Sequence, residues 1–221
     1  MDVFQAVTTR RSIRKFKSDP VPEALIREIL EAARWSPSWG NTQPWEIVVV
    51  SGESLERFKK ANRHRLIDGV IPEPDTAMPG GWPDTLKKRY TEVGKRVLTA
   101  MGIARGDQEA RLRYTGDMFM LFDAPCLILF CVDRALCREY AMLDVGAIQQ
   151  TICLLAHARG LGSCILAASV SYPGLIREML PLQETKAVII GIALGYPDGD
   201  APINRFSRER ANLDEFTNWV R

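Results

Sequence analysis

The sequence has 221 residues, of which 46% are hydrophobic, enough for one sizeable core or at most two small ones. Its 29 basic and 27 acidic residues give a formal net charge of +2, so nothing in the charge balance calls for nucleic acid or an anionic membrane as a partner. No apolar run reaches the length of a membrane span, and the first residues lack the pattern of a secretory signal. The five cysteines have no repeated spacing, so we expect reduced thiols and a cytoplasmic protein.

Hydrophobic periodicity and turn residues divide the chain into helices and a few strands. In chain order we expect a helix at 2–9, a basic stretch at 10–17, a helix at 25–33, a turn-rich loop at 36–45, a strand at 47–50, a mostly helical region at 52–122 with an irregular insert at 71–83, a strand at 125–133, a long helix at 141–156, a strand at 163–168, a short helix at 172–180 and a strand at 186–194. Helices dominate, which predicts an α+β sheet with helices packed on it. No shift in composition marks a linker, so residues 1–221 are expected to form a single domain.

The basic stretch is the first candidate for a binding site. If the stretch is extended, Arg10, Ser12 and Arg14 share one face and can surround a single anion. The planar donor fork of arginine matches phosphate oxygens, and serine adds a hydroxyl donor. The alternative is a solvated run of charge, which is common for such clusters. A nucleic-acid site is a weaker interpretation, because the cluster is isolated in a nearly neutral chain.

Two further segments could hold a flat ligand. The loop at 36–45 offers hydroxyls, amides and two indoles on a rigid turn, although an ordinary connection with core tryptophans fits equally well. The strand at 163–168 ends in Ala167 and Ala168, where small side chains let the backbone approach a ring closely. The glycines before this strand follow a helix, the reverse of the dinucleotide fingerprint, so a Rossmann site is not expected.

Other catalytic groups are scarce. The chain has only two histidines, and Cys153 and His157 share a helical face without a second pair of ligands, so no metal site is expected. There is no nucleophile elbow and no P-loop.

The order and spacing of these segments resemble the nitroreductase family over nearly the whole chain. The resemblance lies in Arg10-Arg11-Ser12-Ile13-Arg14-Lys15-Phe16, Ala33-Arg34-Trp35-Ser36-Pro37-Ser38, Asn41-Thr42-Gln43-Pro44-Trp45, Gly160-Leu161-Gly162-Ser163-Cys164, Gly191-Ile192-Ala193-Leu194-Gly195-Tyr196-Pro197 and Asn204-Arg205-Phe206-Ser207-Arg208. It implies an α+β nitroreductase-like fold, with a central, mostly antiparallel sheet flanked by helices. It also implies a homodimer with FMN at the subunit interface.

The resemblance assigns roles to individual residues. Arg10, Ser12 and Arg208 would hold the FMN phosphate with Arg205 nearby, Arg11 would contribute mainly through its backbone, and Arg14 would reach the N1 and O2 edge of the flavin. The partner subunit would lay a loop with Pro37, Ser38, Trp39 and Asn41 against the flavin, while Ile165, Leu166, Ala167 and Ala168 would back the ring.

Two positions depart from the family pattern. Asp117 stands where many members have an asparagine that bonds the flavin pyrimidine edge, and Met120 replaces a lysine, which leaves Arg14 as the main cation there. An aspartate at position 117 could still accept from the flavin N3–H.

The implied activity is hydride transfer from NADH or NADPH through FMN to an electron-poor acceptor, such as a nitroaromatic or a quinone. No side-chain nucleophile is needed, which suits the scarcity of histidine. The alternatives are a reductive dehalogenase, a flavin-fragmenting relative, or a flavin-binding module without turnover. We read no substrate from the insert at 71–83.

Overall fold

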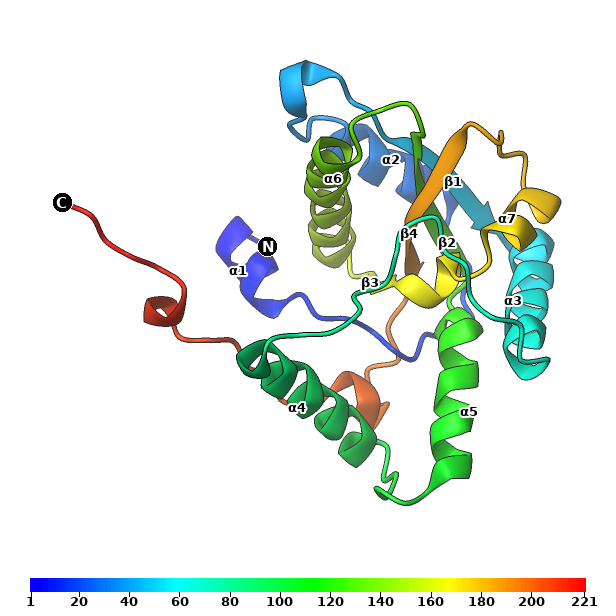
Figure 1. Ribbon diagram of the computed structural model, residues 1–221, viewed down its shortest axis with the longest axis vertical. Coiled ribbons are helices and arrows are strands. Elements are labelled where there is room, and N and C mark those ends of the chain that lie inside the picture. Colours follow the sequence, from blue (N-terminus) through cyan, green and yellow to red (C-terminus); the bar gives the residue numbers. More distant parts are fainter.

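The computed structural model describes residues 1–221, and a four-stranded sheet forms its centre (Figure 1). The strands are β1 (Glu46–Ser51), β2 (Cys126–Asp133), β3 (Gly162–Leu166) and β4 (Lys186–Gly195). Their order across the sheet is β1-β2-β4-β3, and every neighbouring pair is antiparallel. This confirms the α+β class and the antiparallel sheet, and it leaves β3 at one edge.

Helices cover both faces of the sheet. They are α1 (Val3–Thr9), α2 (Glu23–Ala33), α3 (Gly52–Ile67), α4 (Asp84–Ala100), α5 (Gln108–Phe119), α6 (Arg138–Ala158) and α7 (Pro173–Met179). Figure 1 shows α2 and α6 on one face and α3 and α7 on the other, and each pair packs on its own hydrophobic core. No helix combines the length and the apolar character that crossing a bilayer requires.

Strand β2 separates the two hydrophobic cores. Ile128 and Phe130 belong to the core under α2 and α6, whereas Leu127 and Leu129 belong to the core under α3 and α7. Because both faces of the strand are covered, its residues are almost all apolar, and the sequence reads as one hydrophobic run. Burial raises the pKa of the Cys126 thiol to about 12, so this thiol stays protonated at neutral pH.

The predicted strand at 163–168 is two residues too long. β3 ends at Leu166, and Ala167–Val170 form a 3₁₀ turn. Ser169 explains the early end, because its Oγ donates to the Leu166 carbonyl at 2.6 Å. The same hydroxyl lies so close to Gly191 of β4 that a Cβ there would be 2.3 Å from it.

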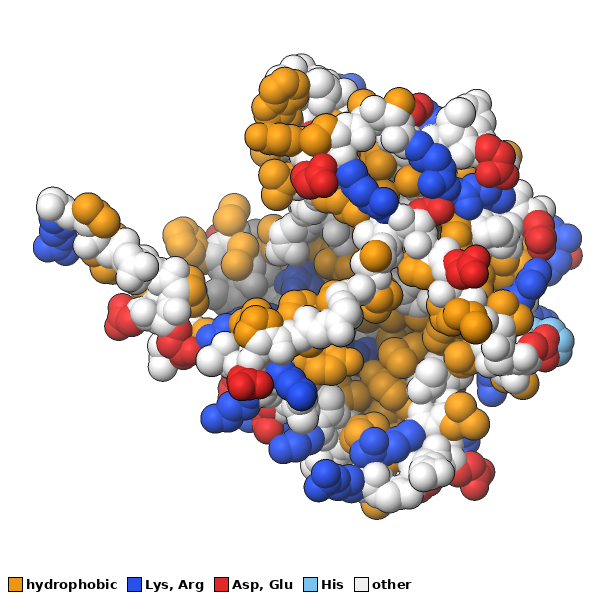
Figure 2. Space-filling model, viewed as in Figure 1, with side chains coloured by type: hydrophobic (Ala, Val, Ile, Leu, Met, Phe, Trp, Pro, Cys, Tyr) orange, Lys and Arg blue, Asp and Glu red, His pale blue; other side chains and the backbone are white.

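Helix α1 forms where the sequence predicts it, but its apolar face is not buried. Val3, Phe4 and Val7 are exposed, and only Ala6 is covered. The C-terminal tail also has exposed apolar residues. It extends away from the rest of the molecule (Figure 1), and hydrophobic side chains are exposed along it (Figure 2). Phe216 is among the exposed residues of this tail. The fold therefore leaves apolar surface at both ends of the chain.

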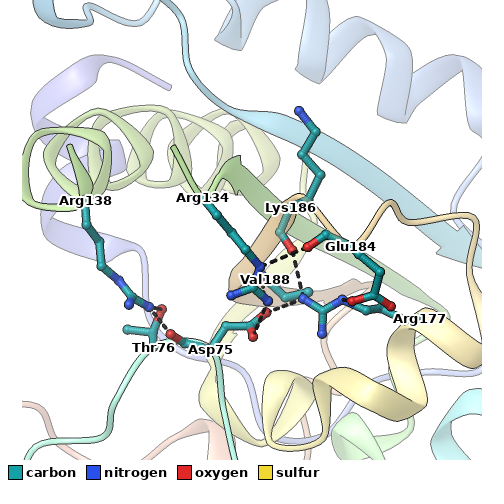
Figure 3. Close-up of polar contacts among 8 residues, drawn as sticks. All are labelled: Asp75, Thr76, Arg134, Arg138, Arg177, Glu184, Lys186 and Val188. Atoms are coloured by element: carbon teal, nitrogen blue, oxygen red, sulfur yellow. Dashed lines mark hydrogen bonds and ion pairs between the residues drawn. The ribbon is translucent and has the colours of Figure 1, made fainter. Parts of the chain in front are cut away.

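The insert at 71–83 is anchored to the body through Asp75, whose carboxylate is 10% exposed. It accepts from Arg134 Nη2 at 2.7 Å, from Arg177 Nη2 at 2.6 Å and from the Val188 N–H at 2.8 Å (Figure 3). Burial alone would raise the pKa of Asp75, but these three hydrogen bonds outweigh it and hold the pKa below its ordinary value. The insert is thus tied to β4, to α7 and to the loop after β2 before it leads into α4.

Candidate functional site

The basic stretch lies extended beside β3, the arrangement that the sequence interpretation required. Ser12 forms an isolated parallel β-bridge with Ser163, and the Ile13 N–H donates to the Ser163 carbonyl at 2.9 Å. A glycine is needed next to this contact, because a Cβ at Gly162 would lie 2.6 Å from the Ile13 side chain. Ile13 is buried, so the alternating Ser12 and Arg14 side chains point to the opposite side.

Four guanidinium groups gather here without a carboxylate. None of Arg10, Arg11, Arg14 and Arg208 forms an ion pair, and the buried Nε of Arg10 has no hydrogen-bond acceptor. Burial and then the charge of Arg14 lower the pKa of Arg11, and burial and then Arg11 lower that of Arg208. A cluster of partly buried cations with an unpaired donor is suited to an anion with several oxygens, such as a phosphate group.

Asn204 holds the backbone of the basic stretch in place. Its Oδ1 accepts from the Arg14 N–H at 2.8 Å, and its Nδ2 donates to the carbonyls of Lys15 at 2.8 Å and Asp198 at 2.9 Å. The side chain is buried, so its three hydrogen bonds are shielded from water. Asn204 belongs to one of the segments that resemble the family, but no local pattern indicates this structural role.

Phe206 and Arg208 continue this contact, and the tail runs antiparallel to the basic stretch. The Phe206 ring lies 5.6 Å from the guanidinium carbon of Arg11 and 5.8 Å from that of Arg14. Arg208 donates to the Arg10 carbonyl and to carbonyls at the end of α1. The structure therefore brings Arg208 to Arg10, as expected. Some of the N–H donors of Arg208 are already bonded to backbone carbonyls.

Arg205, in contrast, makes no contact with this cluster. Its guanidinium pairs with Asp200 at 2.5 Å, and its side chain lines a cavity of about 680 Å³ beside α4. Most of the residues that line this cavity are polar or charged. Arg205 already has a counter-ion, so its candidacy as a phosphate ligand is weaker than that of Arg10.

His157 is a neighbour of the cluster that the sequence interpretation missed. One ring nitrogen lies 2.8 Å from the Oγ1 of Thr9, at the point where α6 ends beside α1. Burial first, and then the charges of Arg10 and Arg208, lower the pKa of this histidine. Its four-residue spacing from Cys153 suggested only a core pairing, because the approach of α1 cannot be read from the sequence.

The segment after β3 has its carbonyl groups engaged by side chains. Ser169 donates to the Leu166 carbonyl, Ser171 donates to the Ala167 carbonyl at 3.5 Å, and the buried Asn62 donates to the Ala168 carbonyl at 3.1 Å. These contacts hold the backbone in one orientation. On the same edge, the Ile165 side chain is 41% exposed although its neighbours in β3 are buried.

The loop with Pro37, Ser38, Trp39 and Asn41 lies at the other end of α6. The Trp39 N–H donates to Asp144 at 3.0 Å, and its ring packs 5.9 Å from that of Tyr140. Asp144 and His157 are 13 residues apart on one helix, which corresponds to about 20 Å. A single chain therefore keeps this loop away from its own arginines.

Asp117 lies on α5 next to a cavity of about 440 Å³ that Tyr114 also lines. Burial and the charge of Asp123 raise the pKa of Asp117, while Arg63 and Lys15 act in the opposite direction. Lys15 reaches the Asp123 carboxylate at 3.2 Å. The structure thus places two cations, Arg63 and Lys15, near Asp117, although Met120 stands at the family's lysine position.

Comparisons with known proteins agree with this arrangement. Residues 7–196 match the profile of the family described as Nitroreductase family. The chain is 32% identical to 4-nitrobenzoate reductase of Pseudomonas putida over 225 residues, covering 99% of this chain and 96% of the relative. It is also 32% identical to nitroreductase NfnB of Mycolicibacterium smegmatis over 226 residues, covering 100% and 95%.

Solved structures give the same answer for the fold. The FMN and NADPH-dependent nitroreductase NfnB from Sphigopyxis sp. strain HMH superposes with a TM-score of 0.95 at 31% identity, covering 100% of this chain and 99% of the other. FMN-dependent NfnB from Mycobacterium smegmatis, in complex with NADPH, gives 0.93 at 29% identity, covering 99% and 97%. The family profile and these full-length matches show that the chain belongs to the nitroreductase family.

Proposed function

We propose that this protein is an FMN-dependent oxidoreductase that transfers a hydride from NADH or NADPH through FMN to an electron-poor acceptor such as a nitroaromatic or a quinone. The observation that carries the proposal is the group of four guanidiniums beside β3 that have no carboxylate partner. The names of the relatives support the chemistry: one is a 4-nitrobenzoate reductase, and the two solved nitroreductases are described as FMN-dependent, one in complex with NADPH and the other as NADPH-dependent.

The residues present suit the phosphate of FMN. Arg10 has a buried, unpartnered Nε, and Ser12 extends from the same face of the extended segment. The Arg208 guanidinium donates to the backbone carbonyl of Arg10, which holds it beside that residue. We assign these three residues to the phosphate, with Arg11 contributing mainly through its backbone and with Arg205 in a lesser role.

Arg14 has a different task in this proposal, at the N1 and O2 edge of the flavin ring. A fixed cation there favours the reduced, negatively charged form of the ring over the oxidised form. Asn204 and Phe206 hold Arg14, so the charge is oriented before any ligand arrives. Asp117, near Lys15, is assigned to the same edge.

The ring itself would lie against Ile165, Leu166, Ala167 and Ala168. The exposed Ile165 side chain and the small alanines leave room for a flat ligand, and the engaged carbonyls hold the backbone still. Bound FMN would supply the redox chemistry by accepting a hydride and passing electrons to the acceptor, so the protein needs no side-chain nucleophile.

We further propose that the active form is a homodimer with FMN at the interface. The Trp39 loop contacts Asp144, which lies about 20 Å along α6 from His157, the residue beside Arg10 and Arg208, so a second copy is needed to bring a loop against the flavin. The exposed apolar side chains of α1 and of the tail are suited to such an interface. Light scattering should give twice the monomer mass, and a flavin-loaded, active monomer would contradict the proposal.

Two broader expectations remain proposals. We propose that residues 1–221 act as a single domain, supported by the two cores that share one sheet. We also propose a reducing compartment, the cytoplasm, because all five cysteines are free. Limited proteolysis would test the first, and imaging of a tagged protein in its own cell would test the second.

The deciding experiment is the visible spectrum of the purified protein, followed by release and chromatography of the cofactor. A yellow protein that releases FMN supports the proposal, and FAD or no flavin contradicts it. Oxidation of NADH and of NADPH with a nitroaromatic or a quinone then separates an enzyme from a flavin-binding module. Anaerobic assays with halogenated phenols test the reductive dehalogenase alternative.

A further inference from the structure

We infer that Phe206 is a positioning residue of the flavin site: its ring holds the guanidiniums of Arg11 and Arg14 in place and thereby sets the reduction potential of the cofactor. The inference rests on the proposed FMN site. It adds a residue that neither contacts phosphate nor carries charge.

The contacts of Phe206 are unusual for a phenylalanine. Its ring belongs to neither hydrophobic core and is only half-buried. Phe206 also lines the cavity of about 680 Å³ beside α4 that Arg205 lines. The ring lies within 6 Å of the guanidinium carbons of Arg11 and Arg14, and the Phe206 carbonyl accepts from Arg11 Nη2. Apolar packing therefore does not explain why an aromatic side chain stands here.

Electrostatics supplies a reason. Arg11 and Arg14 carry like charges close enough for Arg14 to lower the pKa of Arg11, and neither has a carboxylate partner. Without an opposing attraction, two such side chains would move apart into solvent. The negative face of an aromatic ring attracts a guanidinium at these distances. Phe206 offers that attraction to both groups and adds no net charge, so the site stays positive for an anion.

The ring can act in this way because its backbone is fixed on both sides. Two residues before it, Asn204 is bonded to the main chain of Arg14 and Lys15. Two residues after it, Arg208 is bonded to the carbonyl of Arg10. The ring is therefore presented to the arginines from a rigid clasp and not from a loose tail.

The test replaces Phe206 by leucine, which keeps an apolar side chain and removes the aromatic face, and by tyrosine, which keeps that face. In F206L we expect a lower flavin midpoint potential. The rate of reduction by NAD(P)H should fall by about two- to fivefold, which corresponds to the energy of an exposed cation–π contact. F206Y should resemble the wild type. Ring-fluorinated phenylalanine at position 206 keeps the shape and weakens the negative face, so it should lower the potential even if F206L folds poorly.

A double-mutant cycle shows whether Phe206 acts through Arg14. The change in potential that F206L causes should shrink or vanish in an R14A background. A core variant, F58L, is the control for general destabilisation, because Phe58 is fully buried in α3 and contacts no arginine of the site. It should lower stability without moving the potential.

Two results would overturn the inference. One is a flavin-loaded F206L or fluorinated protein with wild-type potential and reduction rate. The other is an effect of F206L that is equally large with and without Arg14. Both differ from failure of the proposed function, in which the wild-type protein itself would bind no FMN.

Discussion

Asn204 accepts a hydrogen bond from the backbone N–H of Arg14 at 2.8 Å, although 190 residues separate the two in the chain. The C-terminal segment thus shapes the N-terminal segment that carries most of the candidate phosphate ligands. The site requires the C-terminal segment to pack on the basic stretch, which itself lies beside β3. Stability and flavin binding are therefore expected to be linked at this contact.

Replacing Asn204 by alanine should lower the free energy of unfolding by about 2 to 4 kcal/mol, because buried backbone partners lose their hydrogen bonds. Urea denaturation of the flavin-free protein measures this loss, and FMN affinity should fall as well. Asn212→Ala is the matched control: it removes the cap of a short exposed turn and should cost about 1 kcal/mol or less. Equal stability of the two variants would show that the hydrogen bonds of Asn204 to Arg14 and Lys15 do not stabilise the fold.

Replacing Arg10 by alanine should weaken FMN binding by about 2 kcal/mol or more, because a charge-assisted hydrogen bond to the phosphate is lost. The same is expected for Arg208→Ala. Arg205→Ala should change the affinity by less than about twofold, since that exposed side chain is already paired with Asp200. Titration of flavin-free protein with FMN gives the three affinities. If the double variant of Arg10 and Arg208 retained all its flavin, the phosphate would have to lie elsewhere.

Replacing Arg14 by alanine should lower the flavin midpoint potential and slow reduction by NAD(P)H, while FMN affinity falls less than in Arg10→Ala. The reason is that reduction adds negative charge to the edge of the ring that Arg14 faces in the proposal. For a two-electron couple, about 30 mV corresponds to about 1.4 kcal/mol, so a redox titration resolves even a modest loss. An unchanged potential combined with severe flavin loss would make Arg14 a phosphate ligand instead.

The pKa of His157 should rise when FMN binds. In the free protein, burial and the charges of Arg10 and Arg208 hold this pKa below its ordinary value. A phosphate dianion among the arginines offsets their charge and favours the protonated ring. Proton NMR titration of the ring signals, with and without FMN, measures the shift. The chain has only one other histidine, His64 on α3, whose signal serves as an internal reference. An unresponsive His157 would place the anion away from α6.

Replacing Asp75 by asparagine should lower stability by about 3 kcal/mol or more, because Arg177, whose side chain is only 11% exposed, and the adjacent Arg134 lose their shared carboxylate. The folded-state pKa of Asp75 lies below its unfolded value, so the ionised group stabilises the protein above about pH 4. That contribution is lost as the pH falls through the folded pKa. Thermal unfolding at pH 7 and below pH 4 should show a difference between wild type and variant that shrinks in acid. Asp19→Asn, at an exposed position without an ion pair, is the control.

Much of the fold could be predicted from local pattern. The run from Cys126 to Asp133 is apolar because both faces of β2 are covered, and a single sequence shows that directly. The end of the long helix was readable too, because Gly160 adopts a left-handed conformation just beyond it. The length of β3 was not readable, since Ser169 and Gly191, which end the strand early, come together only in the folded sheet.

The chemical character of the candidate site can be read from local pattern: an extended basic stretch, a small-residue strand end, an aromatic loop and a tail with arginines, in the order typical of one family. Which of these groups contact one another depends on the folded chain. It joined Arg208 to Arg10, paired Arg205 with Asp200 instead, and set Phe206 against Arg11 and Arg14. The contacts of Arg208 and Phe206 join segments nearly 200 residues apart. Local periodicity carries no record of them, because it reports only which face of an element is buried.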